Sequence, residues 1–88
     1  MMMSETVDLR TGLIRASGHL TAQGADLLRG TADSLREGGH RRVVLDLAGI
    51  READDAGVAE LHSLRDRFAA DGAELVLRHA TQVTAEPV

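Results

Sequence analysis

Three aspartates, Asp46, Asp54 and Asp55, are the side chains whose type and spacing could do chemistry. Carboxylates can bind a hard cation, act in acid–base catalysis, or accept hydrogen bonds from the free N–H groups at the start of a helix. No histidine or further carboxylate lies at a recognisable ligand spacing from them. The sequence therefore predicts no catalytic residue and no metal site, and it favours a helix start at Asp54 and Asp55.

Other reactive side chains are scattered along the chain. The histidines have no paired spacing, and we expect them to be solvated on loops or helix surfaces and to bind no metal: His19, His40, His62 and His79. Ser63 could carry a phosphoryl group, but a hydroxyl on an exposed helix usually has no such role. Gly38-Gly39 follows a predicted helix rather than a strand, which is the wrong context for binding nucleotide phosphates. No cofactor is expected.

The composition is that of one folded, acidic domain. The chain has 88 residues, of which 43% are hydrophobic and 27% charged. Its 14 acidic and 10 basic residues give a net charge of -4, which disfavours direct binding to nucleic acid. There is no cysteine, no secretion-type leader and no run of about 20 apolar residues that could span a bilayer. We therefore expect a cytoplasmic protein without direct membrane insertion.

The first half of the chain predicts a β-hairpin followed by a helix. Residues 6–9 and 13–16 partly alternate between apolar and polar side chains around Arg10-Thr11-Gly12, a typical turn sequence. Thr21 is a plausible N-cap for a helix that ends near Arg36. The apolar stripe of this helix recurs at steps of three and four residues and consists of Ala25, Leu28, Ala32 and Leu35.

The second half predicts a strand, a helix and a strand. Residues 43–47 form an aliphatic run typical of a strand buried on both faces, and Ala48-Gly49-Ile50 is expected to end it. Asp46 is expected to hydrogen-bond the neighbouring loop. A helix then runs from Asp54-Asp55 to about Asp71-Gly72, and residues 73–78 are the last strand. The stripe of this second helix is Val58, Leu61, Leu64 and Phe68.

These elements predict an α/β fold in a single domain, residues 1–88, with a core at about 6–78 and a C-terminal tail at 79–88. Strand-helix-strand units with short links imply parallel pairing through right-handed crossovers, whereas the N-terminal hairpin is antiparallel. The sequence therefore predicts a four-stranded mixed sheet that starts with a β-hairpin and carries two main helices.

Three segments in this order resemble the STAS domain of bacterial anti-sigma factor antagonists. They are VVLDLAGI at 43–50, DDAGVAEL at 54–61 and GAELVL at 72–77. The family pattern is an apolar strand ending in Asp-Leu-Ser-Gly, then Asp-Ser-Ser/Thr-Gly-Leu opening a helix, then a strand led by Gly. Residues 18–21, GHLT, stand where the family has Gly-Glu-Leu-Asp. The similarity runs from about Leu13 to about Arg78.

The resemblance implies both a fold and a function. Family members carry their helices on one side of the sheet and a phosphorylatable Ser at the start of the second helix. The unphosphorylated domain binds an anti-sigma factor with a kinase-type ATPase fold, and phosphorylation blocks the complex because it adds about two negative charges to the covered surface. For this chain, the resemblance implies a partner-binding surface formed by Thr21, Asp54, Asp55, Ala56, Gly57 and Val58.

The chain departs from the family pattern at the phosphorylation site. Asp55 stands at the position of the Ser and Ala56 follows it, so neither side chain offers a hydroxyl. A carboxylate carries one negative charge and fewer acceptor oxygens than a phosphoryl group, so Asp55 imitates phosphoserine imperfectly. Regulation by phosphorylation at this site would be absent, and the domain would be either fixed in a phosphorylated-like state or matched to a partner that accepts Asp.

The C-terminus is the second departure. Residues 81–88 are too few for the helix that usually follows the last strand in the family, so this helix is expected to be shortened or absent. Apolar sheet surface could then be left uncovered, which would suit a homodimer or a tightly held partner.

The sequence thus predicts a non-enzymatic protein-interaction domain that binds an anti-sigma factor around Asp55. Two alternatives remain open. One is an accessory subunit of a membrane lipid-transport ATPase, a role that other stand-alone STAS-like domains have. The other is a dimerisation module with a degenerate site, in which Asp54 and Asp55 are helix-start residues with no further role.

Overall fold

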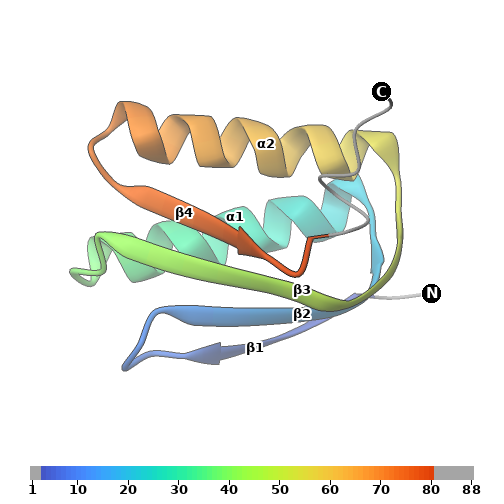
Figure 1. The fold of residues 1–88 in the computed structure, drawn as a ribbon, viewed down its shortest axis with the longest axis horizontal. Helices are drawn as coiled ribbons and strands as arrows, with labels where there is room; N and C mark the ends of the chain where they lie inside the picture. Colours follow the sequence, from blue (N-terminus) through green and yellow to red (C-terminus); the bar gives the residue numbers. More distant parts are fainter. Residues whose placement is uncertain (1–2, 81–88) are drawn as a thin grey trace.

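A computed structural model describes residues 3–80 of the chain, and its elements follow the predicted order (Figure 1). The elements are β1 (Ser4–Asp8), β2 (Leu13–Leu20), α1 (Ala22–Glu37), β3 (Arg42–Ala53), α2 (Asp55–Ala70) and β4 (Glu74–Arg78). No helix within this described part of the chain is long and apolar enough to cross a membrane.

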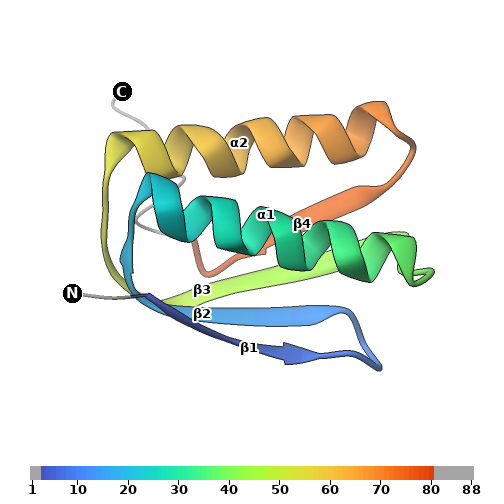
Figure 2. The same ribbon diagram turned by 180° about the vertical axis from the view of Figure 1, so that it is seen from behind.

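The sheet has the strand order β1-β2-β3-β4, and its pairing is mixed as predicted. β1 and β2 form an antiparallel hairpin, whereas β2 with β3 and β3 with β4 are parallel. Each parallel step is bridged by a helix, and a right-handed crossover repeated in the same direction puts both helices on the same face. Figures 1 and 2 show α1 and α2 side by side over that face.

The hairpin turn is closed by local chemistry. The Oδ1 atom of Asp8 accepts hydrogen bonds from the backbone N–H groups of Arg10 and Thr11, at 2.9 and 3.4 Å. Gly12 follows with a φ of +74°, a left-handed conformation that glycine adopts without a steric penalty. The predicted turn is therefore confirmed, although β1 begins earlier and β2 ends later than the sequence pattern indicated.

The end predicted for the third strand is wrong. β3 continues through Ala48 and Gly49 to Ala53, because β2 is long enough to pair with it along that extension. Register shifts in β2–β3 keep Ile50 in the core after the irregularity. Gly49 is needed for the close approach of the strands, since a Cβ atom there would lie 2.7 Å from the Cβ atom of Ser17.

The two helices bury the predicted stripes except for the half-buried Val58, and ion pairs join the helices at their exposed edges. Arg67 donates to both carboxylate oxygens of Asp33, at 2.7 and 2.9 Å. Arg36 donates to Asp71 at 2.9 Å and lies over the ring of Phe68. The hydrogen bond to Asp71, helped by the charge of that carboxylate, raises the pKa of Arg36 above its already high ordinary value. Arg36 is therefore always charged.

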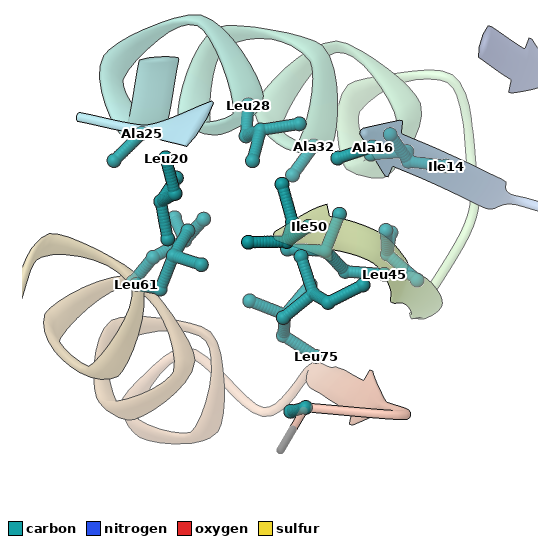
Figure 3. Packing of buried hydrophobic residues seen from close by; sticks show 14 of the residues in the cluster. Ile14, Ala16, Leu20, Ala25, Leu28, Ala32, Leu45, Ile50, Leu61 and Leu75 are labelled. Atoms are coloured by element: carbon teal, nitrogen blue, oxygen red, sulfur yellow. The ribbon is translucent and has the colours of Figure 1, made fainter. Parts of the chain in front are cut away.

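The core lies between the helices and the covered face of the sheet (Figure 3). Phe68 is fully buried there, as the sequence predicted. Ala80, which the sequence assigned to the tail, is 8% exposed and belongs to the same cluster. His79 is also described and is exposed, whereas residues 81–88 of the predicted tail, including any shortened C-terminal helix, lie outside the described residues.

Candidate functional site

The starts of α1 and α2 lie against each other at one end of the molecule (Figure 2). The backbone N–H of Asp54 donates to the carbonyl oxygen of Leu20 at 2.8 Å, which ties the two helix starts together. Gly57, in the first turn of α2, packs against the chain just before α1: a Cβ atom at this position would lie 2.9 Å from the carbonyl oxygen of Thr21. The sequence segments predicted to form one surface are therefore neighbours in space.

Thr21 is the N-cap of α1, as predicted. Its Oγ1 atom accepts a hydrogen bond from the backbone N–H of Gly24 at 3.1 Å, which satisfies one of the N–H groups that a helix start leaves free. The side chain is half-buried and its hydroxyl is already engaged. Thr21 therefore fixes the shape of the surface and offers a partner only part of its side chain.

Asp54 occupies the N-cap position of α2, but its side chain makes no capping hydrogen bond. Its Oδ1 atom lies instead 2.8 Å from Nε2 of His19, and Nδ1 of the same imidazole lies 4.0 Å from Glu52. His19 comes from the end of β2, where it is in register with Glu52 on β3. This cluster links the two strand ends beneath the candidate surface.

The prediction that the histidines are all solvated is wrong for three of them, which are half-buried. The side chain of His19 is only 26% exposed and is held by Asp54. His62 is half-buried on α2, and its Nε2 atom is buried without a hydrogen-bond partner. His40 is also engaged, 2.7 Å from the carbonyl oxygen of Leu9, whereas His79 is exposed. Within residues 3–80, no three His, Asp or Glu side chains are placed to hold a metal ion.

Asp55 is the first residue of α2 and is exposed. Within the described chain its carboxylate makes no hydrogen bond or ion pair, and its position in the first turn is favoured by the helix dipole. Ala56 beside it is also exposed, whereas Val58 is half-buried and Gly57 is buried. Among the residues predicted to contact a partner, Asp54, Asp55 and Ala56 therefore form the accessible surface.

Asp46 lies apart from this site. It is in the middle of β3, on the face of the sheet that the helices do not cover, and its Oδ1 atom accepts from the backbone N–H of Ala48 at 3.0 Å. The predicted hydrogen bond to the following residues is present, but its partner Ala48 lies within β3 and not in a loop. A hollow of about 250 Å³ also lies on that face, lined by Arg15, Ser17 and Gly49 among others, and not at Asp55.

A mixed four-stranded sheet with two helices on one face is the fold of solved STAS domains. The chain belongs to this family, because the family model described as "Mlab, STAS domain" matches residues 3–88. No curated protein matches the chain.

Solved structures share the fold. The STAS domain of an antisigma-factor antagonist from Rhodobacter sphaeroides is 20% identical with a TM-score of 0.65, over 99% of this chain and 95% of that one. The anti-sigma factor antagonist SpoIIAA, in its unphosphorylated form, is 11% identical with a TM-score of 0.61, over 86% of this chain and 71% of its own. A structure of Mglu is 28% identical with a TM-score of 0.64, over 74% of this chain but only 16% of Mglu.

Proposed function

We propose that the chain is a non-enzymatic, cytoplasmic protein-interaction domain of the anti-sigma factor antagonist type. It binds an anti-sigma factor with an ATPase fold through Asp54, Asp55 and Ala56, with Thr21, Gly57 and Val58 shaping the surface behind them. The observation that carries this proposal is the position of Asp55: an exposed carboxylate that opens α2 and has no partner within the described chain. No catalytic residue and no cofactor takes part.

The chemistry of Asp55 supports a permanently charged surface. Asp55 and Ala56 offer no hydroxyl, so a kinase that modifies the start of α2 in other family members would find no acceptor here. Phosphorylation at this position therefore does not change its charge. Asp54 beside it is shared with His19, so Asp55 is the carboxylate that a basic group of the partner can reach without breaking a contact.

The test is a binding titration of the native domain, Asp55→Ser and Asp55→Arg against the purified ATPase-fold anti-sigma factor of the same organism. If Asp55 contacts the partner, the Asp55→Arg change should weaken binding by about tenfold or more. The new positive charge would repel the basic group of the partner that Asp55 attracts. Asp66→Arg is the matched control, since Asp66 lies on the same helix with a side chain that is 79% exposed. Equal affinity of all variants would contradict the proposal.

The Asp55→Ser variant separates two modes of action. If the native domain binds the anti-sigma factor, the chain acts as an antagonist that phosphorylation at this site does not control. If only Asp55→Ser binds, the proposal that the native domain binds through Asp55 is wrong, and Asp55 acts instead as a fixed mimic of the phosphorylated state. The same variant incubated with ATP and the partner kinase should take up phosphate, whereas the native domain should not take it up at this position.

A second candidate is an accessory subunit of a membrane lipid-transport ATPase. It is favoured by the description of the matching family, which names Mlab and no anti-sigma factor antagonist. The same titration distinguishes the candidates when the ATPase subunit of such a transporter is added as a second probe. Binding to this ATPase alone, with loss in Asp55→Arg, would replace the first candidate by the second.

A further inference from the structure

The face of the sheet opposite the helices carries an ordered pattern of charged and apolar side chains. On β3, Val43, Leu45 and Leu47 are buried toward the helices, so the alternate residues point the other way. Within the described chain no helix or strand covers that face, which we name the open face (Figures 1 and 2). Its centre is a row of half-buried apolar side chains in register across three strands: Leu13, Val44 and Val76.

Charges of opposite sign flank this row along β3 and β4. On β3, Arg42 precedes Val44 by two residues and Asp46 follows it by two; on β4, Glu74 and Arg78 flank Val76 in the same way. Adjacent strands carry opposite charges in register: Arg42 lies 3.3 Å from Glu74, and Arg78 lies 3.8 Å from Asp46. The sign therefore alternates both along each strand and across the two strands.

This pattern is complementary to itself. Consider a second copy turned by 180° about an axis that runs along the row from Val76 to Leu13, so that the two open faces meet. This rotation places each strand over the same strand of the other copy but reverses its direction. The charged positions two residues before and two residues after the apolar row therefore exchange places. Arg42 then faces Asp46 of the other copy, and Glu74 faces Arg78, while the apolar rows meet at the centre. The four charged contacts that β3 and β4 then form between the copies, two on each strand, are attractive.

We propose that the open face binds a second copy of this chain in this antiparallel arrangement. Two sheets that pack face to face lie about 10 Å apart, and here the apolar row would form the centre of the contact with the charged side chains around it. β1 lies at the edge of the contact, where Asp8 is in register with Leu13 and therefore faces its own counterpart; this like-charge contact at an exposed edge weakens the dimer. The surface is distinct from the Asp55 site, which lies at the helix starts, so the dimer does not depend on the proposed function.

The contact is small, so the dimer is weak. Strands about 4.8 Å apart and residues about 3.3 Å apart give three strands of five residues a footprint on the order of 15 by 15 Å. This is below the roughly 800 Å² per partner of a standard stable interface. Self-association is therefore expected only at concentrations on the order of 100 μM or above, in the range of weak, transient contacts.

Sedimentation equilibrium of the native chain between about 5 μM and 1 mM tests the proposal. Interference optics are required because the chain has no Trp and no Tyr. The weight-average mass should rise from 9.4 kDa toward twice that value. A mass that stays at that of the monomer up to 1 mM would overturn the proposal.

Two charge reversals test the arrangement itself. Glu74→Arg places Arg against Arg78 of the other copy, and Arg78→Glu places Glu against Glu74, so each variant alone should associate at least about tenfold more weakly. In an equimolar mixture both contacts become attractive again, and a mixed dimer should form. Association of either variant as tight as that of the native chain, or absence of the mixed dimer, would overturn the arrangement.

Controls separate the interface from folding. Asp66→Arg reverses an exposed charge on α2, away from the open face, and should leave association unchanged. Circular dichroism should show native secondary structure for every variant. If a charge reversal unfolds the strand, Val76→Thr replaces it: Thr keeps the shape and the strand preference of Val but adds a hydroxyl to the apolar row, so association should weaken severalfold. Unchanged association of Val76→Thr would count against the proposal.

Discussion

Each of the two helices begins with backbone N–H groups that have no partner within the helix, and the residues at the two starts differ in whether a side chain accepts from these groups. At the start of α1, Thr21 caps the helix with its hydroxyl. At the start of α2, Asp54 occupies the same position but gives its carboxylate to His19, and Asp55 follows with its own carboxylate exposed. The N-cap side chain of α1 therefore stabilises its own helix through a hydrogen bond, whereas the carboxylate of Asp55 at the start of α2 makes no hydrogen bond within the described chain. That difference is what makes the start of α2 the candidate binding surface.

Glycine at the third helical position sharpens the same comparison. In α1 this residue is Gly24, and a Cβ atom there would meet the flexible side chain of Met3 at 3.0 Å. In α2 it is Gly57, where a Cβ atom would meet the backbone oxygen of Thr21 at 2.9 Å. A side chain can move aside and a paired backbone cannot, so Gly57 sets how closely the two helix starts approach.

The largest effect is therefore expected for Gly57→Ala. It should lower the free energy of unfolding by about 2–3 kcal/mol, because the added methyl group overpacks a rigid contact. Gly24→Ala is the matched control and should change it by less than about 1 kcal/mol, since Met3 can yield and Ala favours the helix. Urea unfolding followed by circular dichroism measures both. Equal losses would show that the packing at the two helix starts does not differ.

Local patterns predicted most of the fold. The apolar spacing and Thr21 located α1, and the aspartates located the start of α2. The end of β3 was not predictable in this way, because Ala48-Gly49 reads locally as a turn. Pairing with β2 overrides that preference, and Gly49 is required for the close approach to Ser17 rather than for chain reversal.

Local patterns predicted which residues lie at the candidate surface but not which contacts they make. Asp54 and Asp55 follow from the helix start, but the contact between His19 and Asp54 joins residues 35 positions apart. It depends on the parallel register that sets His19 beside Glu52, and this register is not visible in a local pattern. The alternation of apolar and polar residues along 13–16 can be extended to Leu20, and this extension was the indication in the sequence that His19 lies on a strand.

The next largest losses of stability are expected when the two N-cap side chains are removed. Thr21→Ala should cost about 1 kcal/mol of stability, because the N–H of Gly24 loses its acceptor. Asp54→Ala should cost only about half as much, because this side chain makes no capping hydrogen bond. Urea unfolding of both variants under the same conditions measures the difference. A greater loss in Asp54→Ala would mean that Asp54 supports α2 more strongly than Thr21 supports α1.

The link between His19 and Asp54 should be weaker still. A double-mutant cycle of His19→Ala and Asp54→Ala should give a coupling free energy of about 0.5 kcal/mol, as for other partly exposed pairs. The cycle of His19→Ala with Glu52→Gln is the control and should give a coupling near zero, because that carboxylate is 4.0 Å away and its side chain is 76% exposed. A coupling free energy of similar size in both cycles would show that Asp54 does not stabilise His19 more than Glu52 does.

The smallest change in stability is expected at Asp55. Asp55→Ser removes one favourable charge from the start of α2 and should cost about 0.3–0.5 kcal/mol, and Asp55→Asn should cost about the same. The two variants differ in chemistry, because only Ser offers a hydroxyl that a kinase can phosphorylate. Thermal unfolding and phosphate uptake measured on the same pair separate the two roles. A loss above about 2 kcal/mol in both variants would make Asp55 a structural residue, whereas a small loss with altered partner binding means that its charge acts outward, unlike the hydroxyl of Thr21.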